Sequence, residues 1–213
     1  MTDFNSGYAM TIGGKSVTTT ATVDVFNPAT RQVIARVPDA TQADLDAAVA
    51  AGADQFKRWR GSTHAERAAA LNAIASVLER NAEAFMALLT REQGKPRAGA
   101  EWEIMGSALW FREIAKQSLP EELVEETADR RVVTRFSPLG VVGAITPWNF
   151  PILLAVSKIA PAIAAGNTIV LKPSPFTPLC TLKLGELCQE VLPPGLFNVV
   201  SGGDDLGKWM TAH

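Results

Sequence analysis

The chain has 213 residues, of which 47% are hydrophobic and 20% charged, and its formal net charge at pH 7 is −2. This composition is typical of a globular protein with a real core, and the scattered basic residues give no positive field for nucleic acid or an anionic membrane. No apolar run approaches the roughly 20 residues that a membrane-spanning helix needs, and the start of the chain lacks the pattern of a signal peptide. We therefore expect a soluble protein of the cytoplasm that binds neither nucleic acid nor membrane.

The first part of the chain predicts short strands and then a layer of helices. Runs of β-forming residues separated by turn residues predict two strand pairs, over residues 9–12, 15–17, 24–26 and 33–37. Helices are expected over residues 43–59 and 65–80, because Thr41 with Asp44 and Thr63 with Glu66 have capping-box spacing. Gly94 is expected to end a third helix.

A longer helix is predicted over residues 97–117. Large apolar residues recur there with near-helical spacing, and we interpret them as a core-facing stripe rather than as ligand contacts. The stripe consists of Trp102, Met105, Leu109, Trp110 and Ile114.

The next segment predicts a solvated strand pair. Residues 119–129 are rich in acids, and residues 130–136 form a run of basic and β-forming side chains before Pro138. An exposed strand edge of this kind favours association with another chain.

From Gly140 onward the pattern predicts a β-α-β-α-β unit. Strands are expected over residues 140–146, 168–172 and 197–201, and helices over residues 152–165, 177–191 and 204–211. Right-handed crossovers would bring the loops after Thr146, Lys172 and Ser201 to one edge of a parallel sheet. No GxGxxG pattern is present, which counts against an ordinary Rossmann fingerprint.

The turn Pro147-Trp148-Asn149-Phe150-Pro151 follows the first strand of that unit. Each proline fixes its own φ and restricts the residue before it, so this loop is stiff. Cys180 and Cys188 fall on an apolar helix eight residues apart, about 12 Å along its axis, too far for a disulfide. We expect both to be buried, reduced core cysteines rather than nucleophiles.

Ordered motifs along the whole chain resemble those of the NAD(P)-dependent aldehyde dehydrogenase superfamily. They include FNPAT at residues 26–30, EQGKP at 92–96, PLGVV at 138–142, PWNFP at 147–151, GNTIVLKPS at 166–174, LPPG at 192–195 and NVVSGG at 198–203. The resemblance implies an α/β fold: the amino-terminal half of an aldehyde dehydrogenase, with an incomplete Rossmann-like parallel sheet, a helical apron and an oligomerisation hairpin. It divides the chain into residues 1–117, which pack on the cofactor domain, residues 118–138, which project as the hairpin, and residues 139–213, which begin the cofactor-binding unit.

The resemblance also implies roles for particular residues. Asn149 would donate a hydrogen bond to the oxyanion that forms when a thiolate attacks an aldehyde, a role that its side-chain amide suits chemically. The cofactor would contact Ile145, Thr146, Pro147, Trp148, Lys172, Ser174, Pro175, Gly203 and Gly207, with Lys172 on the adenosine ribose. No metal is expected. We expect NAD as the cofactor. Many relatives have a glutamate where this chain has Pro175, and a carboxylate there would repel the 2′-phosphate of NADP. Its absence leaves NADP open.

The nucleophilic cysteine and the general-base glutamate of such enzymes lie beyond His213, so we expect a truncated chain that is inactive alone. The complete protein would be a homo-oligomer that oxidises an aldehyde to a carboxylic acid with NAD(P). Two alternatives are a non-catalytic nucleotide-binding fragment and a structural protein of the same fold.

Overall fold

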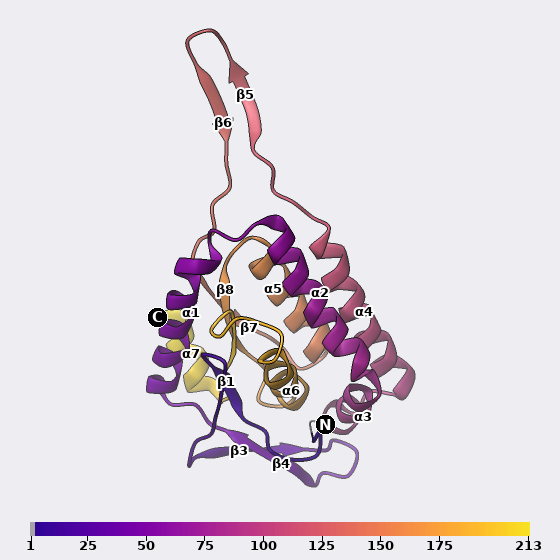
Figure 1. The fold of residues 1–213 in the computed structure, drawn as a ribbon. Coiled ribbons are helices and arrows are strands. Elements are labelled where there is room, and N and C mark those ends of the chain that lie inside the picture. Colours follow the sequence, from indigo (N-terminus) through magenta and orange to yellow (C-terminus); the bar gives the residue numbers. More distant parts are fainter. Residues whose placement is uncertain (1–2) are drawn as a thin grey trace.

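The structure, a computed structural model, describes residues 3–213 and places a mixed sheet between helices (Figure 1). The sheet has five strands in the order β2-β1-β9-β8-β7. Their bounds are β1 Met10–Ile12, β2 Lys15–Val17, β7 Val141–Ile145, β8 Thr168–Lys172 and β9 Phe197–Val199. Strands β7, β8 and β9 are parallel, which confirms the predicted β-α-β-α-β unit. Strand β1 is antiparallel to β9 as well as to β2, so the amino-terminal strand pair extends this sheet.

Helices cover both faces of the sheet. They are α1 Gln42–Trp59, α2 His64–Arg80, α3 Ala82–Gln93, α4 Arg97–Ala115, α5 Pro151–Ala164, α6 Leu179–Cys188 and α7 Asp204–Ala212. Helices α1 and α7 lie on one side of the strands in Figure 1, and α2, α4 and α5 lie on the other. Central strand β8 is buried throughout. Its Ile169 and Leu171 join the larger core, whereas Val170 between them joins a smaller core with Leu45 and Leu206, because successive side chains of a strand alternate between faces.

The predicted helix ends are confirmed by their caps. Thr41 with Asp44 and Thr63 with Glu66 form complete capping boxes, each hydroxyl accepting the third N–H of its helix. Gly94 ends α3 in the left-handed conformation with φ of 78°, and its N–H donates to the carbonyl of Thr90 (3.0 Å).

The prediction that the apolar stripe of α4 faces the core is wrong. Its large members are exposed, namely Trp102, Met105, Leu109 and Trp110, and Ile114 is only partly buried. The buried face of α4 instead carries mostly small residues around Ile104 and Phe111, which let α4 pack closely between its neighbours. Because both faces of α4 contain apolar residues, the helical period alone did not identify the buried one.

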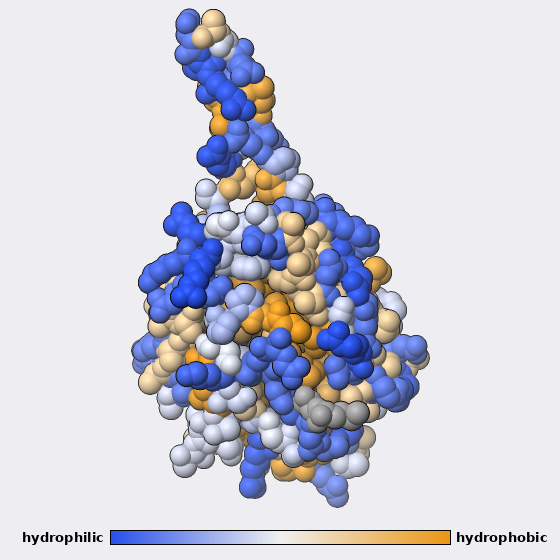
Figure 2. All heavy atoms as spheres, in the orientation of Figure 1, coloured by the Kyte–Doolittle hydropathy of each residue, from blue (hydrophilic) through white to orange (hydrophobic). Residues whose placement is uncertain are grey.

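Two strand pairs lie outside the main sheet. They are β3 (Thr22–Phe26) with β4 (Val33–Pro38), and β5 (Glu122–Glu126) with β6 (Arg131–Thr134). The β5–β6 hairpin projects far from the body, as Figure 1 shows, and its surface in Figure 2 is mostly hydrophilic with some apolar side chains. Exposed ion pairs cross it, such as Glu121 with Arg135 and Glu125 with Arg130. The predicted solvated strand pair is thus confirmed.

Across residues 3–213, the helices are too short or too polar to cross a bilayer.

Candidate cofactor and active site

The carboxyl ends of the parallel strands meet at one edge of the sheet. The N–H of Thr146, which follows β7, donates to the carbonyl of Lys172 at the end of β8 (3.0 Å). The N–H of Val200, which follows β9, donates to the carbonyl of Leu171 (2.9 Å). The predicted convergence of these loops is therefore confirmed, and it occurs at the edge where open α/β sheets bind ligands.

The turn at residues 147–151 leads from β7 directly into α5. Ile145 and Trp148 are about half exposed, and Pro147 and Asn149 are exposed as well. Within residues 3–213 the side-chain amide of Asn149 makes no hydrogen bond. Its donor is therefore available to an oxygen atom that gains negative charge at this edge.

Lys172 is almost completely buried, with 4% of its surface exposed. Its ammonium group forms neither an ion pair nor a hydrogen bond with any described residue. Burial lowers the pKa of Lys172, while the charges of Asp204 and Asp39 act in the opposite direction. A desolvated cation without a direct partner is suited to hold polar groups of a ligand, such as ribose hydroxyls.

Buried hydroxyls lie beside this lysine in the chain and in the sheet. The hydroxyl of Thr146 is buried without a hydrogen-bond partner. Ser174 is also buried, and its hydroxyl accepts the N–H of Phe176 (3.3 Å). An unpartnered hydroxyl and an unpaired ammonium on neighbouring strand ends fit a ligand rich in hydroxyl groups, as a dinucleotide is.

Gly203 and Gly207 lie at the start of α7. A Cβ atom added at either position would meet no other atom within 4 Å, so the surface beside both glycines is open. Gly203 is the N-cap residue of α7, and its N–H donates to Asp39 Oδ1 (3.3 Å). Open space at a helix N-terminus permits the close approach of an anionic group.

A cavity of about 470 Å³ is lined by two of the predicted cofactor residues, Trp148 and Pro175. Its remaining wall comes from the β3–β4 pair, the end of α3 and the loop before α6, and includes Glu92. Of the other predicted residues, Thr146 and Lys172 are joined by a backbone hydrogen bond, and neither lines this cavity. The predicted set therefore spans the strand edge rather than lining a single pocket.

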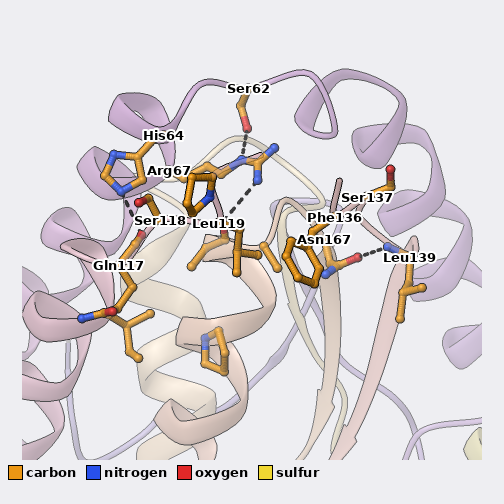
Figure 3. A pocket seen from close by; sticks show the side chains of 15 residues that line it. Ser62, His64, Arg67, Gln117, Ser118, Leu119, Phe136, Ser137, Leu139 and Asn167 are labelled. Carbon is orange, nitrogen blue, oxygen red and sulfur yellow. Dashed lines mark hydrogen bonds between the residues drawn. The ribbon is translucent and has the colours of Figure 1, made fainter. Parts of the chain in front are cut away.

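A larger cavity of about 720 Å³ lies at the opposite end of the strands, at the base of the hairpin (Figure 3). Polar side chains that line it form hydrogen bonds with the backbone of other segments of the chain. Arg67 donates to the carbonyl of Ala164 (3.2 Å), and Asn167 Oδ1 accepts the N–H groups of Leu139 (2.7 Å) and Gly140 (3.0 Å). This cavity is thus remote from the predicted cofactor residues.

Both cysteines are buried free thiols on α6, as predicted. Burial raises the pKa of Cys180 and of Cys188 well above the ordinary range. The thiolate form that a nucleophile requires is therefore disfavoured at both positions.

One residue for which the sequence predicted no role, Lys95, contacts the turn. Lys95 Nζ donates to the main-chain carbonyl of Asn149 (3.1 Å), and Lys95 forms an ion pair with Glu103. The EQGKP motif contains Lys95, but nothing local in the sequence connects it to a turn more than 50 residues away.

The fold defines an α/β protein whose parallel strands bring their carboxyl ends to one edge of the sheet. Residues 16–213 match the model of the aldehyde dehydrogenase family. The chain belongs to this family of NAD(P)-dependent oxidoreductases.

Individual relatives agree with this assignment. Aldehyde dehydrogenase LUC3 of a Fusarium species is 40% identical over 202 residues, which are 95% of this chain and 42% of the relative. The structure of aldehyde dehydrogenase from Bacillus cereus superposes with a TM-score of 0.94 at 34% identity, over 99% of this chain and 45% of that one. An NADP-dependent enzyme of E. coli superposes with a TM-score of 0.88 at 35% identity, over 92% and 42%. The chain thus spans less than half the length of these relatives.

Proposed function

We propose that this chain supplies the cofactor wall and the oxyanion donor of an aldehyde dehydrogenase that oxidises an aldehyde to a carboxylic acid with NAD(P). One observation carries this proposal: the same edge of the sheet holds both the free side-chain amide of Asn149 and the buried ammonium of Lys172, which has no ion-pair partner among the described residues. The backbone bond between Thr146 and Lys172 ties the two loops together. A purely structural protein of this fold would have no need to bury an unpaired lysine.

Several of the predicted residues have distinct tasks in the proposed reaction. The amide of Asn149 donates to the aldehyde oxygen as that atom becomes negatively charged, a contribution of roughly 3 kcal/mol for one preorganised donor. Lys172 holds ribose hydroxyls, and Ile145, Thr146, Pro147 and Trp148 line the cofactor cleft on the nicotinamide side. NAD(P), when bound, accepts hydride from that carbon.

The remaining chemical groups are assigned outside these residues. The thiols of Cys180 and Cys188 are inside the core, so neither reaches an aldehyde at the strand edge. We assign the nucleophilic cysteine and the general-base glutamate to the part of the family's length that this chain does not span. The projecting hairpin is assigned to homo-oligomer formation in the whole protein.

Pro175 bears on the choice of cofactor. A carboxylate at this position would bind the ribose diol and repel a 2′-phosphate, and proline does neither. We propose NAD as the cofactor, and Pro175 leaves NADP open.

Calorimetric titration of the purified chain with NAD and with NADP tests the proposal. We expect Lys172→Met to raise the Kd for NAD at least tenfold, about 1.4 kcal/mol, because the ribose loses its cationic donor. Lys116→Met, which changes an exposed lysine at the end of α4, is the matched control and leaves the Kd unchanged. The chain alone should produce no NADH from an aldehyde.

Two results would contradict this scheme. A folded chain that binds neither nucleotide would favour a structural role for the fold. NADH formation by the chain alone would show that a nucleophile within it had been overlooked.

A further inference from the structure

The start of α5 has no cap within its own segment. Its N-cap residue is Phe150, whose side chain cannot accept a hydrogen bond, and Pro151 follows it. The next two N–H groups, of Ile152 and Leu153, donate to Glu103 Oε1 on α4 at 2.9 and 3.2 Å. A carboxylate from another helix therefore caps α5, where both its charge and its lone pairs are favourable.

Glu103 is completely buried, and its charge has one partner. Its other oxygen pairs with the ammonium of Lys95, whose side chain is 10% exposed. That ammonium also donates to the main-chain carbonyl of Asn149 (3.1 Å) and lies 3.9 Å from the centre of the Phe150 ring. One ion pair thus contacts the backbone at Asn149, within the turn, and at Ile152 and Leu153, directly after it.

We propose that Lys95 and Glu103 are positioning residues that fix the turn at residues 147–151 and thereby aim the Asn149 amide. The inference rests on the proposed function of Asn149 as an oxyanion donor. Asn149 itself is exposed and its amide makes no hydrogen bond within residues 3–213, so its direction depends on the backbone that carries it. The two prolines restrict that backbone internally, while Lys95 and Glu103 attach it to α4.

The test is nuclear magnetic resonance of the chain labelled with [15N]asparagine. In the unmodified chain the backbone order parameter of Asn149 should be near 0.85, like that of rigid backbone. Asn198 is an internal reference in the same spectrum, because it is buried and its side-chain amide donates to the carbonyl of Gly195 (2.9 Å). A mobile Asn149 backbone, with an order parameter below about 0.6, would overturn the inference without any substitution.

The main variant is the double substitution Lys95→Met with Glu103→Gln. It removes the lysine donor and both charges together, so no unpaired charge is left in the core, and the glutamine can still accept an N–H of α5. We expect the Asn149 side-chain resonances to shift and the N–H groups of Ile152 and Leu153 to exchange at least tenfold faster relative to Leu171 in β8. Lys95→Arg, which keeps the cation, should restore the unmodified spectrum when Glu103 is present.

The control variant is Arg112→Met with Glu79→Gln, which removes another ion pair of α4 that does not touch the turn. It should leave the Asn149 resonances in place. If the Lys95 and Glu103 variant accelerates exchange equally everywhere and leaves Asn149 unshifted, the pair is only structural and the inference fails. NAD titration of the unmodified chain separates the two proposals. Absence of NAD binding would count against the cofactor site but not against the attachment of the turn.

Discussion

At the scale of single residues, two buried carboxylates cap helices that lack caps of their own. Glu103 accepts the first N–H groups of α5, and Glu92 accepts those of Leu179 (2.7 Å) and Cys180 (3.0 Å) at the start of α6. The two acids differ in their partners. Glu103 has an ion pair with Lys95, whereas Glu92 forms no ion pair with a described residue, and burial raises the pKa of Glu92 to about 7 despite its two backbone donors.

The raised pKa of Glu92 predicts that the free energy of unfolding depends on pH. The folded state holds this proton more tightly than the unfolded state, whose carboxyl titrates near 4.5, so the stability from this group is complete below pH 4.5 and is lost as pH rises toward 7. The loss is on the order of 3 kcal/mol. Urea unfolding between pH 4.5 and 8 should show a flatter profile for Glu92→Gln than for the unmodified chain. Glu83→Gln, on the exposed surface of the same helix, should leave the profile nearly unchanged.

An identical pH profile for Glu92→Gln and the unmodified chain would mean that the two N–H donors keep Glu92 ionised throughout this range.

At the scale of the element, α4 shows why burial cannot be assigned from apolar spacing alone. Both of its sides carry apolar residues, and the side with fewer large ones is buried because α4 must pack closely against its neighbours. Trp102 is 62% exposed and makes an edge-on contact with Phe150 at 6.1 Å between ring centres. The aromatic residues that look like core in the sequence therefore lie on the surface beside the turn.

Paired substitutions on α4 test this assignment. Phe111→Ala should lower the free energy of unfolding by about 3–5 kcal/mol, because the ring is fully buried and its removal leaves a cavity. Trp102→Ala should cost less than about 1 kcal/mol, because most of the indole is already in solvent. Urea unfolding of both variants is the measurement. A larger loss for Trp102→Ala than for Phe111→Ala would restore the original interpretation of the stripe.

At the scale of the whole molecule, we expect the hairpin and the body to be energetically separate. None of the hairpin's strand residues belongs to either hydrophobic core of the described chain. Leu123, Val124 and Val132 are exposed on it, and both of its outer strand edges are open. Exposed edges with apolar side chains favour pairing with another chain, so we expect this hairpin to form the contact between subunits.

Replacing residues 120–136 by a short glycine-serine linker tests that separation. The free energy of unfolding should change by less than about 1 kcal/mol, because exposed ion pairs contribute little and no core contact is lost. Self-association at high concentration, followed by sedimentation velocity, should decrease. If the shortened chain unfolds at much lower urea, the hairpin supports the body and the proposed division is wrong.

Much of the element order was predictable because its signals are local. The capping boxes at Thr41 and Thr63, the left-handed Gly94 and the apolar run of β8 each depend on residues close together in the chain, and each is confirmed. The convergence of Thr146 and Lys172 was predictable too, because parallel strands joined by right-handed crossovers place their ends on one side. The roles proposed for Asn149, Lys172 and the other cofactor residues remain predictions.

The sequence by itself determined the elements, the family and the edge of the sheet where the predicted site residues lie, because periodicity, caps and motifs depend on residues close together in the chain. Only the tertiary structure decided three features: the pairing of β1 with β9, the buried face of α4, and the attachment of the turn by Lys95 and Glu103. Each of these depends on contacts between segments far apart in the chain. Such contacts are selected by the packing of the whole core, which no local pattern encodes.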